Sequence, residues 1–290
     1  MIKDSELIIN EDGSIFHLHI KPHELAQTVI LVGDPGRVEM LASFFENVKY
    51  QGQNREFVFK TGTFKGKEFT ALSTGIGTDN IDIVLNELDA LANIDFKTRT
   101  IKEEKKSLDI VRLGTSGGLQ ANVPAGTFVI SEKSIGFDGL LNYYYNRDVV
   151  CDLDFEEKMV KELGYLDCLA DPYVVDASTE LLEKILKGGN IVKGVNISAP
   201  GFYGPQGRII RLGLAMPDIN DRIEHFEYKN RKITNYEMES SAIYGLSKLL
   251  GHKAATVCTI IANRVTKDYC ADYKVHVKKM VEIVLEQLAK

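Results

Sequence analysis

Three short apolar runs in this chain each stop at a glycine-rich loop. Residues 28–32 run into GDPGR (33–37), residues 69–73 into TGIG (74–77), and residues 109–113 into GTSGG (114–118). Helical periodicity follows the first two loops, ending at about residue 45 in the first case. Buried strands that give way to glycine loops and helices are typical of α/β folds, whose ligands bind beyond the strand ends. The sequence therefore predicts an α/β fold.

Apolar periodicity predicts the remaining elements. The helix after the second loop carries apolar residues at helical spacing, at Ile81, Val84, Leu85, Leu88 and Leu91, and Thr78 or Asp79 is expected to cap it. Further strands are expected at 127–131, 191–198 and 255–262, and further helices at 154–163, 239–250 and 273–288. Gly251 is expected to end the second of these helices.

One stretch interrupts this pattern. Residues 95–107 are dense in charges of both signs, and the interleaved glutamates cancel most of the field of the lysines, so a solvated insertion is expected rather than an anion site. The chain contains no repeat and no low-complexity linker. We therefore expect a single domain over residues 1–290.

Charge and cysteine content exclude several classes of protein. The net charge of −6 and pI near 5.6 argue against a nucleic-acid partner. The four cysteines form no CxxC pair, which argues against a disulfide framework or a zinc knuckle. His17, His19 and His23 lack a nearby cysteine or a defined third ligand, so no metal is expected. Without an apolar leader or spanning segment, a cytoplasmic protein without membrane contact is expected.

Arginines accompany the loops. Arg37 ends the first loop, Arg112 precedes the third, and Arg55 lies in the NREF run. Guanidinium groups, backbone N–H groups and a hydroxyl such as that of Thr115 together hold oxyanions well, because charge-assisted hydrogen bonds replace a tightly bound hydration shell. Each loop alone is weak evidence, but the combination predicts a phosphate site.

A second pair of motifs predicts a binding site for a nucleoside. In GFYGPQGR (201–208), Gln206 and Arg208 offer an amide and a guanidinium two residues apart, which suits the edge of a flat heterocycle. In NYEMES (235–240), a carboxylate at a predicted helix start suits a sugar diol. Both Glu237 and Glu239 have the alternative of being solvated charges stabilised by the helix dipole.

GDPGR, STGIG, RLGTSGG, FYxxQxR, NYEMES and the late ANR together resemble the uridine phosphorylases of the nucleoside phosphorylase-I family, nearly end to end. The resemblance implies a three-layer α/β/α sandwich with a central mixed β-sheet. It also implies catalysis by Arg112, Glu239, Gln206 and Arg208. The phosphate ligands it implies are Gly33, Arg37, Arg112, Thr115 and, from a neighbouring subunit, Arg55. The ribose ligands would be Thr115, Met238, Glu239 and the neighbour's His17, and the base ligands Phe202, Gln206, Arg208 and Arg264.

These assignments imply a homodimer, or an assembly of dimers, with shared active sites. No organic cofactor is implied: inorganic phosphate is the co-substrate, and a monovalent cation between subunits stays open. Arg264 stands where purine phosphorylases of this family place an aspartic acid, which favours a pyrimidine. Pro205 replaces the more usual glycine before the glutamine, so the choice among uridine, deoxyuridine and thymidine stays open. The insertion at 95–107 is expected to alter subunit contacts.

Three alternatives remain at this stage. A hydrolytic nucleosidase would use water, a neutral nucleophile that gains nothing from three arginines. A purine nucleoside phosphorylase would differ at the base end of the site. A nucleoside-binding or storage protein would share the fold without turnover.

Overall fold

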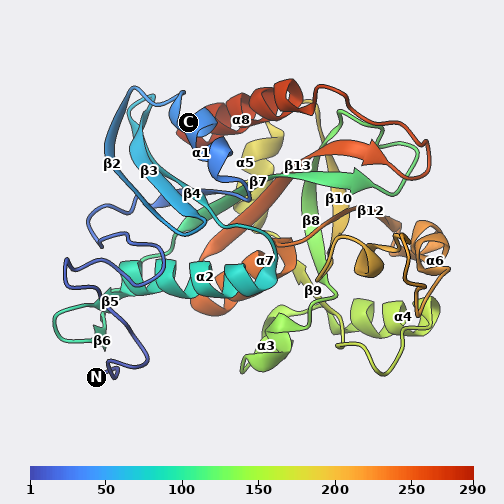
Figure 1. Ribbon diagram of the computed structural model, residues 1–290, viewed down its shortest axis with the longest axis horizontal. Coiled ribbons are helices and arrows are strands. Elements are labelled where there is room, and N and C mark those ends of the chain that lie inside the picture. Colours follow the sequence, from blue (N-terminus) through green and yellow to red (C-terminus); the bar gives the residue numbers. More distant parts are fainter.

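The computed structural model describes residues 1–290, and eleven of its strands form one mixed sheet (Figure 1). The short strands β5 (Ile94–Asp95) and β6 (Thr100–Ile101) form a separate antiparallel pair. The strand order from one edge to the other is β11 (Glu227–Tyr228), β12 (Arg231–Glu237), β10 (Ile191–Ser198), β8 (Phe128–Gly136), β13 (Lys253–Asn263), β7 (Asp109–Gly118), β1 (Thr28–Val32), β4 (Lys67–Ser73), β3 (Phe57–Phe64) and β2 (Asn47–Asn54). The eleventh strand, β9 (Tyr173–Asp176), pairs with β8. β4, β1, β7 and β13 are mutually parallel, whereas β2 and β3 form an antiparallel hairpin.

Part of the sheet closes on itself. β7, β13, β8, β10 and β12 pair in turn, and β12 pairs back to β7 through Tyr236 with Gly117 and Asn235 with Gly118. The closure brings the carboxyl end of β12 beside the carboxyl end of β7. Because β7 carries Arg112 and β12 leads into Glu239, this closure assembles two of the motifs singled out in the sequence.

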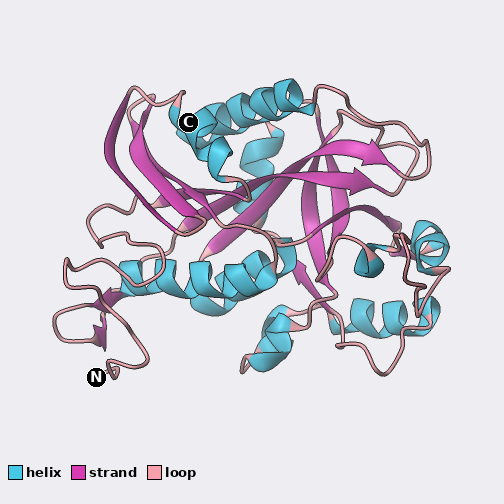
Figure 2. Cartoon of the chain, in the orientation of Figure 1, coloured by secondary structure: helices cyan, strands magenta, loops and turns pink.

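Helices cover both faces of the sheet (Figure 2), which confirms the predicted α/β sandwich. On one face lie α2 (Thr78–Asn93), η1 (Leu140–Tyr143), α3 (Arg147–Val150) and α7 (Ser240–Leu250). On the other lie α1 (Pro35–Ala42), α5 (Thr179–Leu186) and α8 (Tyr273–Ala289). α4 (Leu153–Leu163) and α6 (Ile219–His225) pack together beside β9 and β12. No helix is long and apolar enough to cross a bilayer.

Local sequence explains much of this arrangement. The five apolar residues predicted on one face of α2 are each at most 1% exposed, and burying a side chain of this size contributes roughly 1.5–3 kcal/mol. The predicted cap of α2 is wrong: Gly77, with φ of 99°, precedes the helix and no side chain caps it. α7 does end at Gly251, whose φ of 83° favours glycine.

Two segments differ from expectation. GTSGG is not a loop but the last part of β7, because it pairs with β13 and β12. The hairpin β2–β3 was not predicted, and Arg55 lies in its turn with φ of 54°.

Residues 95–107 have no buried member, as expected for a solvated insertion. The N-terminal segment packs on them, because the Ile2 N–H donates to the Arg99 carbonyl at 2.8 Å.

Tyr244 fixes α7 to the sheet, and its removal provides a stability test. The fully buried hydroxyl donates to the Ser131 carbonyl and accepts from the Thr256 N–H, both at 2.8 Å. Tyr244→Phe leaves both backbone groups unpaired, so we expect a loss of about 1–3 kcal/mol in the free energy of unfolding, measured by urea denaturation. Tyr143→Phe is the matched control, because Tyr143 is 88% exposed. Equal stability of the two variants would contradict this role.

Candidate functional site

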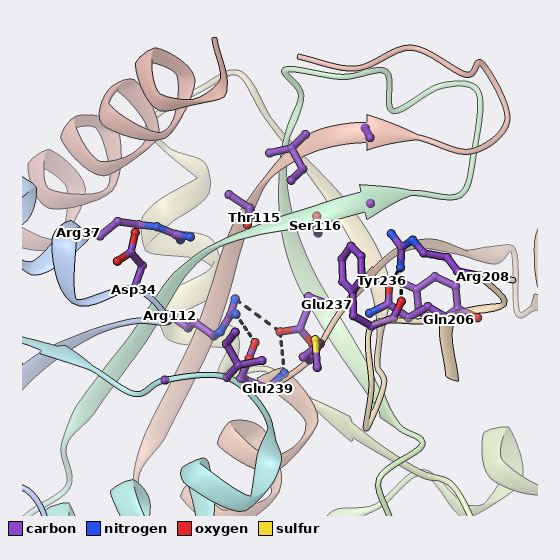
Figure 3. Close-up of a pocket in the computed structure, with 18 of the residues that line it drawn as sticks. Asp34, Arg37, Arg112, Thr115, Ser116, Gln206, Arg208, Tyr236, Glu237 and Glu239 are labelled. Atoms are coloured by element: carbon purple, nitrogen blue, oxygen red, sulfur yellow. Dashed lines mark hydrogen bonds and ion pairs between the residues drawn. The ribbon is translucent and has the colours of Figure 1, made fainter. Parts of the chain in front are cut away.

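A cavity of about 590 Å³ lies where the loops after β1 and β4 meet the carboxyl ends of β7, β12 and β13. Figure 3 shows its polar lining: Arg37 and Asp34 lie at one end, Gln206 and Arg208 at the other, and Arg112 and Glu239 between them. The predicted site residues in the lining are Gly33, Arg37, Arg112, Thr115, Phe202, Gln206, Arg208, Met238 and Glu239. The sheet thus brings together motifs from residue 33 to residue 239.

The end near Arg37 is electropositive. The Arg37 guanidinium forms no ion pair or hydrogen bond, and burial, together with the charge of Arg112, lowers its pKa. Thr115 and Ser116 line the same cavity, and the Ser116 hydroxyl is buried without a partner. Two facing guanidinium groups and free hydroxyls favour an oxyanion, which would relieve the repulsion between the cations.

Arg112 anchors the middle of the cavity. It is 5% exposed, forms a direct ion pair with Glu239 and places Nη1 3.5 Å from a carboxylate oxygen of Glu237. Burial opposes its charge, but these carboxylates outweigh burial and raise the pKa of Arg112, so it stays protonated. Gly114 makes room for this side chain, because a Cβ there would lie 1.9 Å from Arg112 Nη1. Nη1 also lies 3.6 Å from the sulfur of Cys258.

Glu237 holds the turn between β12 and α7. Its carboxylate accepts from the Asn196 side chain at 2.7 Å, from the Ser198 hydroxyl, and from the N–H groups of Glu239 and Ser240 at 3.0 Å. It is 4% exposed, so its interpretation as a solvated charge is wrong. Sequence reasoning did not assign Glu237 to the site, although its position in NYEMES was a usable signal.

Glu239 links that turn to the loop after β4. One carboxylate oxygen pairs with Arg112 and the other accepts from the Gly77 N–H at 2.9 Å. Burial raises the pKa of Glu239, and Arg112 partly opposes that shift. Glu239 is 3% exposed, so it too is not a solvated charge. With Met238 beside it in the lining, this buried acceptor suits sugar hydroxyls.

The opposite end presents a fixed amide. Arg208 Nη1 donates to the side-chain oxygen of Gln206 at 2.6 Å and to the Phe202 carbonyl. The guanidinium carbon lies 3.8 Å from the centroid of the Phe202 ring, a cation–π contact. Because a guanidinium only donates, Gln206 must turn its oxygen toward Arg208, which leaves its NH₂ group free to donate. Pro205 belongs to the one-turn helix η2 (Gly204–Gln206), which positions Gln206.

Arg264 lies beside this end but not in the lining of the cavity. Its guanidinium carbon is 5.2 Å from the Tyr236 ring centroid, and two of its nitrogens, Nε and Nη2, are buried without partners. Burial and then the charge of Arg264 lower the pKa of Arg208 to about 10. Tyr236, which does line the cavity, was not predicted as a site residue.

Arg55 and His17 lie outside the cavity. Arg55 is exposed in the β2–β3 turn, and His17 Nδ1 contacts Glu87 at 2.6 Å. The two lie near each other, because the side chain of Asn54 donates to the His17 carbonyl at 2.9 Å. Both were predicted to act on a neighbouring subunit, so their place outside this chain's own cavity agrees with that prediction without testing it.

The known proteins that this chain resembles include both uridine and purine nucleoside phosphorylases. A uridine phosphorylase from Thermococcus kodakarensis is 26% identical over 265 residues, covering 89% of this chain and 81% of that protein. A DeoD-type purine nucleoside phosphorylase from Listeria welshimeri is 28% identical, covering 84% of this chain and 85% of that protein. A solved Trypanosoma brucei nucleoside phosphorylase, described as showing uridine phosphorylase activity, matches with a TM-score of 0.86 and 30% identity over 97% of this chain and 99% of its own.

The family model described as the phosphorylase superfamily matches residues 27–290, a span that includes every residue of the cavity lining. The chain belongs to the phosphorylase superfamily.

Proposed function

We propose that this protein is a uridine phosphorylase, which converts uridine and inorganic phosphate reversibly into uracil and ribose 1-phosphate. The observation that carries the proposal is the order of groups along one cavity: the unpaired cation Arg37 with Arg112, then Glu239, then the Gln206–Arg208 pair. That order matches phosphate, ribose and base. Inorganic phosphate is a substrate here, and no organic cofactor enters the proposal.

The phosphate end would supply the nucleophile. Cleavage of an N-glycosidic bond develops positive charge on the sugar, which an adjacent phosphate dianion stabilises and then attacks at the anomeric carbon. Arg37 has no carboxylate partner, whereas Arg112 is already paired with Glu239. Arg37 therefore offers the larger uncompensated charge, and Arg112 orients the anion beside the ribose.

The base end would accept the leaving electrons. As the C–N bond breaks, its electron pair passes into the uracil ring and onto the ring carbonyl oxygens, where Gln206 Nε2 and Arg208 can donate hydrogen bonds. Glu239 would accept hydrogen bonds from the ribose hydroxyls. Negative charge spread over carbonyl oxygens needs no separate acid, and the two donors at this end are an amide and a guanidinium.

Each alternative function leaves a different part of the cavity unexplained. A purine nucleoside phosphorylase keeps the phosphate end and is supported by the Listeria relative, but Arg264 stacks near Tyr236 where an acid would be expected. A water-using nucleosidase has no need for Arg37 and Arg112 in one cavity. A protein that only binds or stores nucleosides or phosphate has no need for an anion end and a base end in one cavity.

Uracil release should depend on phosphate. With uridine as substrate, we expect product only when inorganic phosphate is present, and little or no product from inosine, measured by chromatography of uracil and hypoxanthine. Turnover of uridine at the same rate without phosphate would replace this proposal by hydrolysis. Faster turnover of inosine would replace it by a purine phosphorylase.

We also propose that two subunits share each active site, in a homodimer or an assembly of dimers. The support is the common location of His17 and Arg55, joined through Asn54 and lying outside the chain's own cavity. The Arg55 side chain forms no hydrogen bond or ion pair within its own chain, and its backbone lies in the left-handed region at an exposed turn. A monomer would then lack one phosphate ligand.

Mixing two impaired variants, assayed at a phosphate concentration too low for either alone to turn over appreciably, tests this sharing. Arg37→Ala removes a ligand from a subunit's own site, and Arg55→Ala removes one from its neighbour's site. A mixed dimer then contains one intact site, so random exchange should restore about a quarter of wild-type activity. Differently tagged subunits verify exchange by co-purification. Confirmed mixed dimers without recovered activity would exclude a cross-subunit role for Arg55.

A further inference from the structure

A second cavity, of about 420 Å³, adjoins the phosphate end of the first. It lies between α1 and the start of α8, and its lining includes Arg37, Lys274 and Lys278. Asp34 and Arg37 line both cavities, so these two side chains lie between the two spaces. The second cavity therefore shares Arg37 with the phosphate end of the first, and no base-binding residue belongs to its lining.

The charge of this second cavity is mainly positive. Lys274 and Lys278 stand four residues apart on α8, which places them on one face of the helix. Neither forms an ion pair, and the ammonium of Lys278 lies 5.9 Å from the ring centroid of Phe44, just after α1. Asp34 is the only carboxylate in the lining, and it already accepts the Gly36 N–H at 2.9 Å as the cap of α1.

We propose that this cavity captures inorganic phosphate from solution and delivers it to Arg37. The inference rests on the proposed phosphorylase function. A cleft lined by one sign of charge concentrates the opposite ion and speeds its capture, by tenfold or more in favourable cases. Lys274 and Lys278 attract the dianion, and Arg37, shared by both cavities, receives it beside Arg112. The nucleoside can then occupy the base end without blocking the phosphate.

Charge reversal on α8 tests the proposal. Lys274→Glu with Lys278→Glu should lower kcat/KM for phosphate about tenfold at low salt, and leave kcat and the KM for uridine near wild type at saturating phosphate. The dependence of kcat/KM on ionic strength should become flatter, because screening removes an attraction that the variant no longer has. The matched control is Lys193→Glu with Lys279→Glu. Both control lysines are exposed, line neither cavity, and give the same change in net charge.

Calorimetric titration with inorganic phosphate separates this inference from the proposed function, because it needs no turnover. Weaker phosphate binding in the α8 variant than in the control supports the capture site whatever the nucleoside proves to be. Equal binding, and equal kcat/KM for phosphate in both double variants, would overturn it. Thermal unfolding of each variant confirms that the exposed substitutions leave the fold intact.

Discussion

The buried ion pair between Arg112 and Glu239 is the contact on which the arrangement of the cavity depends. It joins β7 to the start of α7, and Glu239 extends the link to Gly77 on the loop after β4. The Glu237 carboxylate lies beside this ion pair and accepts hydrogen bonds from the backbone N–H groups of the turn between β12 and α7. Buried charges persist only when they are paired and hydrogen-bonded, so this network holds β7, the turn between β12 and α7, and the loop after β4 together. The network also requires glycine at position 114, because a side chain there would collide with the Arg112 guanidinium.

The closure of β12 onto β7 explains why the pair can form. Strand ends of an open sheet diverge, whereas here Tyr236 pairs with Gly117 and brings the NYEMES segment against the carboxyl end of β7. The two ends of the cavity then acquire different chemistry. Arg37 has no carboxylate partner, and Lys274 and Lys278 of α8 add positive charge to the second cavity, which Arg37 also lines. Arg208, in contrast, donates a hydrogen bond from Nη1 to the side-chain oxygen of Gln206 and so orients that amide. Arginine therefore has two roles in this cavity: Arg37 provides an unpaired positive charge at one end, and Arg208 orients an amide at the other.

The sequence predicted the elements that have a local signal. Apolar spacing identified α2 and α8, and glycine after an apolar run identified the loops after β1 and β4. It could not predict that GTSGG is a strand, because that depends on pairing with residues more than a hundred positions away. The burial of Glu237 was missed for the same reason, since Asn196 and Ser198 on β10 supply its partners. Motif resemblance located the polar residues of the cavity, but only the fold shows that Arg37 faces two cavities.

The most direct test of the account is a kinetic comparison of Arg37→Ala with Arg208→Ala, using Arg211→Ala, an exposed arginine three residues beyond Arg208, as control. A cavity with an anion end and a base end predicts that Arg37→Ala raises the KM for phosphate and Arg208→Ala impairs use of uridine. Each loss should correspond to about 1–3 kcal/mol in kcat/KM for the affected substrate. If both variants impaired the same substrate to the same extent, or both matched the control, the assignment of the two ends would be wrong.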